Sequence, residues 1–326
     1  MPASRTGQRN KRLDGEIIGG CFQAVAPPTG QEPVVTLCLI YKTMLIPFDG
    51  ILELEGMLLG GQAFRWRLED GWFHNVLFSN IVSARQVDEG VEFVCGPDDE
   101  SVIAPLFRDY LRLDDDLVAI GKTISKGEQI SAAISKYQGL RILRQEPWEC
   151  LVSFICSANS NIPRISTNVE DMARNFGQAL EKNGHVRSAF PSPDVLADVG
   201  EQKLRDLGLG FRAKYVAAAA VSIARGDVDL FSLREASYDD ALEELIGLSG
   251  IGDKVGNCIL LFALDKRQAF PVDVWIERAI KEWYPEVVEQ KVTRRAMRPW
   301  AQEFFGTYAG YANQYLFHGR RLQGKG

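Results

Sequence analysis

A lysine and an aspartate stand at the starts of two successive predicted helices. Lys254 follows a glycine-containing turn at 248–253, and Asp273 follows Pro271 and opens the next helical pattern. A desolvated lysine can attack a carbonyl or masked-carbonyl carbon and form a Schiff base. The pair therefore suits an amine nucleophile that works beside a carboxylate. Position alone would also allow a solvated surface lysine and an aspartate that simply caps its helix.

The turn before Lys254 carries Gly250 and Gly252 between two amphipathic stretches. Apolar spacing predicts a buried helix over 238–246 and a second helix from Val255 onward. The two glycines are expected to permit a turn with positive φ and close approach of another backbone. Free N–H groups at the second helix start would suit a DNA phosphate. An ordinary helical hairpin closed by glycines fits the same residues, because short glycine motifs often match by chance.

These residues belong to a longer pattern. Residues 248–273 resemble the helix-hairpin-helix and Gly-Pro-Asp module of base-excision DNA glycosylases, and most closely that of the 8-oxoguanine DNA glycosylases. Further segments resemble other blocks of that family, in the same order along the chain. They are the N-terminal segment at 60–66, the interdomain joint at 137–150, the DNA-insertion loop at 153–165, and the blocks at 207–216 and 308–317.

The resemblance implies a bifunctional reaction. Lys254 would attack C1′ of the damaged nucleotide and expel 8-oxoguanine, preferably opposite cytosine. The resulting imine would undergo β-elimination and nick the strand, and Asp273 would stabilise the positive charge that develops on the sugar. Two alternatives stay open: a related helix-hairpin-helix glycosylase for another damaged purine, and a non-catalytic DNA-binding module.

The resemblance also implies a pocket for the base, which must leave the stack before its glycosidic bond is accessible. The carbonyl of Gly61 would accept the N7–H that oxidised guanine has and guanine lacks, although a turn glycine is the simpler interpretation. Cys258 and Phe317 would sandwich the base. Asn313 lies one helical turn before Phe317 and would face the base edge. Vertebrate-type members have Gln at this position.

A second set of residues would fill the gap in the DNA. By resemblance, Asn159 would enter the vacated stack, Arg164 and Arg212 would contact the orphaned cytosine, and Phe211 would wedge the opposite strand. Arginine only donates hydrogen bonds, and cytosine offers acceptors at O2 and N3. Core packing is the alternative for Phe211. Trp275 stands where some members have a histidine near a DNA phosphate.

Composition limits how the chain can bind its partner. The net charge of −6 is unusual for a nucleic-acid binder, so a DNA face must be local and its complex salt-sensitive. The predicted partner is double-stranded DNA containing oxidised guanine. The protein is predicted to act as a monomer and to bind no membrane. The basic residues available for that face include Arg164, Arg212, Lys214, Lys254, Arg320 and Arg321.

Cysteine and histidine usage predicts chemistry without a metal. The six cysteines form no CxxC pair and none follows Cys258, which predicts a reduced intracellular protein without a zinc knuckle. It also excludes the C-terminal four-cysteine cluster of iron–sulfur relatives. The three histidines have no metal-ligand spacing. Catalysis is therefore predicted to need no metal and no cofactor.

The elements that position these residues predict an α+β fold. Residues 1–43 are expected to be a flexible leader, dispensable for catalysis, whose apolar run at 34–41 is too short to span a bilayer. Nothing there has the form of a secretory signal. Residues 44–125 are expected to form a small antiparallel sheet domain, with strands at 51–54, 63–67, 72–77 and 91–94. Residues 126–326 are expected to form a helical domain, with the helix-hairpin-helix at 238–265 and an active site in a cleft between helical subdomains.

Overall fold

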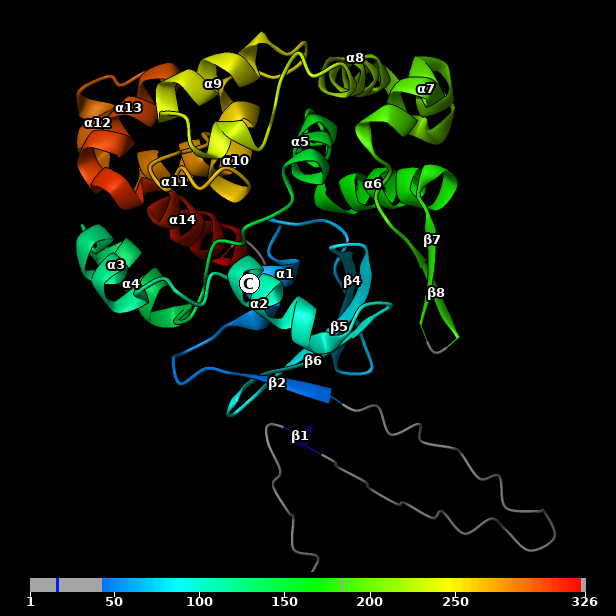
Figure 1. Cartoon of the computed structure of the whole chain (residues 1–326). Helices are drawn as coiled ribbons and strands as arrows, with labels where there is room; N and C mark the ends of the chain where they lie inside the picture. The colour runs from blue at the N-terminus through cyan, green and yellow to red at the C-terminus, as the bar shows by residue number, and fades with distance from the viewer. Residues whose placement is uncertain (1–15, 18–42, 183, 324–326) are drawn as a thin grey trace, which may run out of the picture.

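An antiparallel sheet and a larger set of helices make up the chain, as the α+β prediction required (Figure 1). The structure, a computed structural model, describes residues 16–17, 43–182 and 184–323. The sheet has six strands in the order β1-β2-β6-β5-β4-β3, all antiparallel. The strands are β1 (Glu16–Ile17), β2 (Thr43–Pro47), β3 (Arg67–Glu69), β4 (Trp72–Leu77), β5 (Asn80–Val87) and β6 (Gly90–Gly96).

The strand predictions are partly confirmed. The strand expected at 72–77 is β4, and β6 contains the one expected at 91–94. The strand expected at 51–54 is wrong, because Leu54 opens helix α1 (Leu54–Leu59) after Glu53, whose side chain accepts from Gly56 N. In the segment 63–67 only Arg67 joins a strand. Phe64 and Trp66 are both buried without pairing to another strand, and Arg65 between them is buried too, so the apolar–polar alternation of this segment does not mark a half-exposed strand. Strands β2 and β5 were not predicted.

The first part of the chain contributes one short strand to this sheet. Glu16 pairs with Met44 and Ile17 pairs with Thr43 at the β2 edge. The rest of 1–42 lies outside the described residues. The predictions of a flexible leader and of an apolar run at 34–41 fall on those residues.

Helix α2 (Glu100–Tyr110) packs on β2 and β6 and closes the core of the sheet domain. Phe93 and Phe107 are fully buried there. The indole of Trp66 donates to the Tyr110 hydroxyl at 2.8 Å, which satisfies a polar group inside this aromatic core.

The second domain is mainly helical, with one hairpin that the sequence did not predict. Strands β7 (Ala179–Lys182) and β8 (His185–Ser188) extend from the helices, and Leu180 packs on Val76 and Ile81 of the sheet domain. The helices that follow α2 along the chain are α3 (Leu117–Ile124), α4 (Glu128–Lys136), α5 (Pro147–Cys156), α6 (Ile162–Phe176), α7 (Pro193–Leu204), η1 (Arg205–Leu209), η2 (Gly210–Arg212), α8 (Ala213–Ala224), η3 (Ser232–Arg234), α9 (Tyr238–Gly247), α10 (Asp253–Phe262), α11 (Val274–Trp283), α12 (Pro285–Glu289), α13 (Arg294–Phe305), η4 (Gly306–Tyr308) and α14 (Ala309–Gln323).

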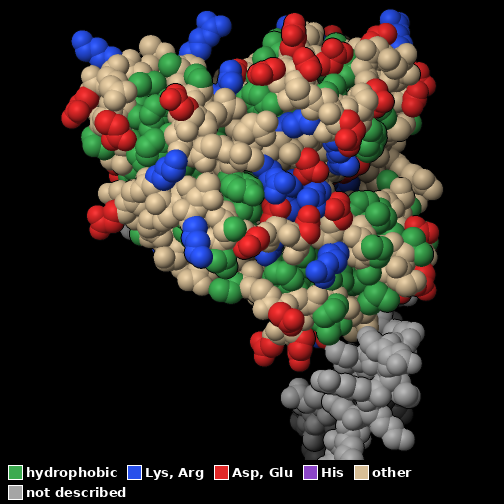
Figure 2. Space-filling view, turned by 60° about the vertical axis from the view of Figure 1, so that its left-hand side comes forward, with side chains coloured by type: hydrophobic (Ala, Val, Ile, Leu, Met, Phe, Trp, Pro, Cys, Tyr) green, Lys and Arg blue, Asp and Glu red, His purple; other side chains and the backbone are tan. Residues whose placement is uncertain are grey.

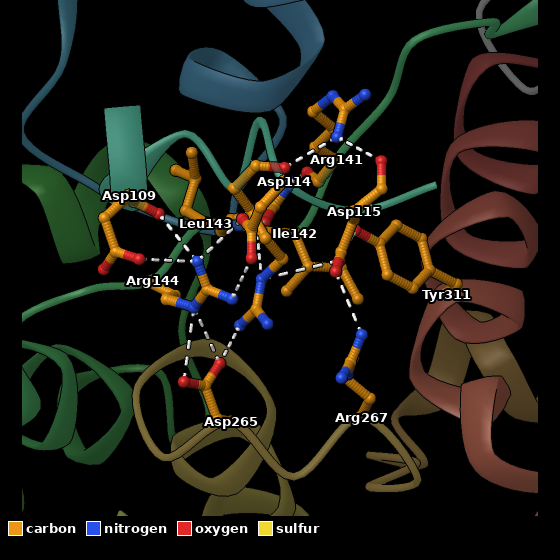
Figure 3. A network of polar contacts seen from close by, with 12 residues as sticks. Asp109, Asp114, Asp115, Arg141, Ile142, Leu143, Arg144, Asp265, Arg267 and Tyr311 are labelled. Carbon is orange, nitrogen blue, oxygen red and sulfur yellow. Dashed lines mark hydrogen bonds and ion pairs between the residues drawn. The ribbon is translucent and has the colours of Figure 1, made fainter. Parts of the chain in front are cut away.

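A network of charged side chains joins the end of α2, the segment 141–144 and the loop after α10 (Figure 3). Arg144 pairs with Asp109 at 2.7 Å, Asp114 at 2.9 Å and Asp265 at 3.1 Å. Hydrogen bonding from Arg144 holds the pKa of Asp114 below its usual value. Asp115 accepts from the Tyr311 hydroxyl at 2.5 Å, so helix α14 is attached to the same joint.

The stretch from Pro193 to Ala224 is long and apolar enough to be compared with a membrane span. Its backbone is interrupted, since Gly200, Gly208 and Gly210 have positive φ angles of 73°, 84° and 60°. Helices α7 and α8, of 12 residues each, lie side by side in Figure 1. Neither helix reaches the roughly 20 residues that a bilayer requires.

Candidate active site

The turn that precedes Lys254 has the predicted helix-hairpin-helix form. Helices α9 and α10 flank it, and Gly252 is the N-cap residue of α10. Gly250 has a φ of 88°, and a Cβ there would lie 2.3 Å from the Tyr215 ring. The expectation of positive φ is wrong for Gly252, which is extended with φ −102° and ψ −179°. A Cβ at Gly252 would meet only open space, so sterics do not require glycine there.

Lys254 projects from the first turn of α10 toward the end of α5. Its Nζ donates to the Ser157 hydroxyl at 3.1 Å and lies 5.3 Å from the centre of the Phe154 ring. Ser157 in turn donates to the Phe154 carbonyl at 2.7 Å, so its oxygen is oriented to accept from the amine. Lys254 is half-buried, which excludes the solvated surface position. The sequence did not identify Ser157 as a partner, because the two residues are 97 positions apart.

Asp273 is the N-cap of α11, as one of its two predicted roles requires. Its Oδ1 accepts from the backbone N–H groups of Trp275 and Ile276, both at 2.9 Å. Because both bonds fall on one oxygen, Oδ2 is left for another partner. Trp275 is 39% exposed beside it, with the Arg278 guanidinium 5.7 Å from its ring.

Cys258 is a buried residue of α10, the helix that carries Lys254. Burial raises the pKa of its thiol to about 11; the nearby Lys254 lowers this pKa and Asp273 raises it. Lys254 and Cys258, four residues apart, share one face of α10.

Asn313 reaches the loop that carries Asp273. Its Nδ2 donates to the carbonyl of Pro271 at 2.9 Å, and the residue is only 2% exposed. The predicted role at the base edge therefore has a specific constraint: one of the two amide N–H groups is engaged, which leaves the second N–H and the oxygen to contact a base. Phe317, one turn further along α14, is half-buried.

Gly61 comes from the sheet domain and is held against the helical domain by its neighbours. It has a φ of 98°. The Gln62 side chain donates to the Arg141 carbonyl at 2.8 Å and accepts from Leu143 N at 2.9 Å. A Cβ on Gly60 would lie 2.7 Å from the His318 ring, so this turn packs on the residue that follows Phe317 in α14.

The predicted opposite-base residues gather at the end of α5. Arg212 is 2% exposed, and its guanidinium donates to the carbonyls of Ala158 and Asn159, both at 2.7 Å. Asn159 itself is exposed and has a φ of 54°. Arg164 is exposed and donates to the Gly208 carbonyl at 3.4 Å. In this structure Arg212 thus holds the loop that carries Asn159.

Phe211 is 46% exposed, so the core-packing alternative is wrong. Its ring meets Tyr215 edge to face at 6.4 Å, and the Arg212 guanidinium lies 4.7 Å from its centre. Tyr215 also contacts Gly250 and was not singled out in the sequence. This aromatic contact connects the opposite-base residues to the helix-hairpin-helix turn.

The net charge of −6 predicts that any DNA-binding face is a local basic patch. On the face in Figure 2, basic side chains gather near the middle and acidic ones lie around them. Two hollows lie on the surface of the described residues. One is lined in part by Phe48 and Gln86, and the other is lined in part by Tyr137 and Trp283. Neither hollow is lined by a predicted site residue, so the expected cleft is not one of these two.

Known proteins match both parts of the chain. Residues 46–151 match the 8-oxoguanine DNA glycosylase N-terminal domain family, and residues 152–302 match the HhH-GPD superfamily of base excision DNA repair proteins. A probable N-glycosylase/DNA lyase of Methanothermobacter thermautotrophicus is 36% identical over 222 residues, which cover 62% of this chain and 70% of that protein. An N-glycosylase/DNA lyase of Arabidopsis thaliana is 34% identical over 273 residues, covering 79% and 74% respectively.

A solved structure is similar over most of its length. It is the Clostridium acetobutylicum 8-oxoguanine glycosylase/lyase in complex with double-stranded DNA that contains cytosine opposite 8-oxoguanine. It aligns with a TM-score of 0.78 at 32% identity and covers 84% of this chain and 93% of that one.

Proposed function

The chain belongs to the 8-oxoguanine DNA glycosylases of the HhH-GPD superfamily, and we propose that Lys254 and Asp273 carry out its reaction through a Schiff base. It is a bifunctional N-glycosylase/DNA lyase that removes 8-oxoguanine from DNA. The observation that carries the proposal is that the half-buried Lys254 amine, bonded to Ser157, and the Asp273 carboxylate stand at the starts of two successive helices.

In the first step the Lys254 amine forms a bond to C1′ and loses its proton, while the bond from C1′ to the base nitrogen breaks. The base leaves with the bonding electrons and takes up a proton. The remaining sugar opens to an imine on Nζ. Loss of a C2′ proton then expels the 3′ phosphate by β-elimination, and hydrolysis of the imine releases the lysine.

Asp273 contributes electrostatic stabilisation. As C1′ loses the base, positive charge develops on the sugar, and a fixed carboxylate nearby lowers the energy of that state. Its N-cap bonds through Oδ1 hold the carboxylate in place before the reaction begins. Oδ2 is then the oxygen that faces the sugar.

Preference for cytosine as the partner base is supported by Arg164 and Arg212. Arg164 donates to the Gly208 carbonyl and Arg212 donates to the adjacent Leu209 carbonyl, so the two guanidinium groups lie close together. Cytosine offers O2 and N3 as acceptors, whereas adenine presents an amino donor that would leave an arginine unpaired. The Clostridium acetobutylicum relative is known bound to the cytosine pair.

Borohydride trapping on a duplex with 8-oxoguanine opposite cytosine tests the proposal. Borohydride reduces the imine to a stable amine, so the wild-type protein should become covalently attached to the DNA. Lys254→Gln should abolish this adduct and still bind the duplex, while the matched change Lys281→Gln, at an exposed lysine of α11, should leave trapping unchanged. Undiminished trapping by Lys254→Gln would overturn the assignment.

A further inference from the structure

Two arginines of α13 each contact a residue next to a proposed catalytic group. Arg294 and Arg298 are four residues apart, so they lie on one face of the helix. Arg298 pairs with Asp253, which immediately precedes Lys254. Arg294 donates to the carbonyl of Val272, which immediately precedes Asp273.

Arg298 is the more extensively bonded of the two. Its Nε donates to Asp253 Oδ1 at 2.9 Å, and its Nη1 donates to the Tyr238 hydroxyl and to Gln302 Oε1, both at 3.2 Å. Its side chain is 23% exposed. A partly buried guanidinium with three partners in a fixed fork holds its neighbours more firmly than a solvated surface pair.

Asn257 extends this network to the loop that carries Asp273. The Tyr238 hydroxyl donates to Asn257 Oδ1 at 2.7 Å, and Phe270 N donates to the same oxygen at 3.2 Å. Asn257 Nδ2 donates back to the Asp253 carbonyl at 2.8 Å. Asn257 is fully buried, so breaking one of these bonds leaves a polar group unsatisfied inside the protein.

Arg294 holds the other end of the same loop. Its Nη2 donates to Val272 O at 3.2 Å, and its Nε lies 3.5 Å from Glu277 Oε2 in α11. Its side chain is 49% exposed, so this contact is the weaker one. The first two turns of α13 thus contact both the start of α10 and the loop before α11. The relative position of these two segments decides the separation of Lys254 and Asp273.

We propose that Arg294 and Arg298 are positioning residues that fix the separation of the Lys254 amine and the Asp273 carboxylate. The inference rests on the proposed function of that pair. Reaction rates respond steeply to small displacements of reacting groups, because the bound geometry must match the approach to the transition state. Without the arginines, the start of α10 and the loop 263–273 would keep their secondary structure but lose the contact that sets their spacing.

The test measures single-turnover base release at saturating enzyme, DNA affinity and thermal stability for each variant. Arg298→Ala should lower the saturated rate about 10-fold and Arg294→Ala about 3-fold, as expected for slightly misplaced groups, with DNA affinity unchanged. Arg295→Ala, at the exposed neighbouring arginine, is the matched control and should behave as wild type. Arg298→Lys keeps the charge but not the fork and should give an intermediate rate.

A double-mutant cycle separates positioning from general stabilisation. If Arg298 acts through Asp253, Arg298→Ala and Asp253→Asn should each slow base release, and the double variant should be no slower than the slower single variant. Additive losses, unchanged rates, or weaker DNA binding at an unchanged saturated rate would each overturn the proposal. If Arg298→Ala does not fold, the rates of Arg294→Ala and Asp253→Asn still test the proposal, because both side chains are exposed.

Failure of the positioning role can be distinguished from failure of the proposed function. If Lys254 and Asp273 were not the catalytic pair, Lys254→Gln would still trap DNA, whatever the arginine variants do. If only the positioning role is wrong, Lys254→Gln loses trapping while the arginine variants retain the wild-type rate.

Discussion

The proposed catalytic pair and the proposed opposite-base loop are held in different ways. Lys254 and Asp273 stand at helix starts and are fixed by side-chain hydrogen bonds to Ser157 and by N-cap bonds. Asn159 is exposed in a loop whose backbone carbonyls are bound by the buried Arg212. The difference implies that substitutions in the first region should change the rate of chemistry, whereas those in the second should change which base pair is selected.

The largest effect is expected at Asp273. Asp273→Asn preserves an N-cap, because Asn is as good a cap as Asp, but removes the charge that stabilises the sugar. Base release in single turnover should fall by at least about 100-fold, the range usual for a key charged catalytic group. Asp116→Asn, which alters the N-cap of α3, is the control. A loss below 10-fold at Asp273 would contradict the electrostatic role.

Arg212→Ala tests the second region. The wild-type protein should remove 8-oxoguanine opposite cytosine at least about 10-fold faster than opposite adenine, the factor that about 1.4 kcal/mol represents. Arg212→Ala should reduce that preference more than it reduces the rate on the cytosine pair. Single-turnover rates on the four opposite-base duplexes measure both quantities. Arg205→Ala, at an arginine that pairs with Glu201 one helical turn earlier, should leave the preference unchanged.

Ser157 lies where the two regions meet, two residues before Asn159. Ser157→Ala removes the acceptor of the Lys254 amine, a net loss of about 1 kcal/mol for one hydrogen bond, so borohydride trapping should slow by roughly 3- to 10-fold. The opposite-base preference should not change, since Arg212 binds backbone carbonyls. Ser222→Ala, on α8, is the control. A changed preference at an unchanged trapping rate would show that the regions are not separable.

The smallest effect concerns stability and pH. Burial raises the pKa of Glu149 in α5 to about 7, Arg65 opposes the shift, and Glu146 and Glu170 add to it. A folded-state pKa above the unfolded value stabilises the fold at low pH, and this contribution is lost as pH rises through about 7. The unfolding midpoint should therefore fall as pH rises from about 4.5 to about 7, and should level off above that. Glu149→Gln should flatten that fall, whereas Glu244→Gln, at an exposed residue of α9, should not; equal slopes would contradict this origin.

The helical motif could be predicted from the sequence because its causes are local. Apolar spacing in α9 and α10, the N-cap residue Asp273 and the positive φ of Gly250 each depend on a few neighbouring residues. The sheet was harder to predict. The alternation of Phe64 and Trp66 resembles a strand, but it reflects burial against α5 and α2, which the segment cannot encode by itself.

The sequence by itself determined the residue types of the site, their order and the helix starts that carry Lys254 and Asp273. Only the tertiary structure decided that Ser157 accepts from Lys254, that Asn313 binds the Pro271 carbonyl, and that Arg298 reaches Asp253. These contacts join residues 97, 42 and 45 positions apart. Local periodicity fixes which face a side chain occupies, but the partner on that face is set by the packing of helices from distant parts of the chain.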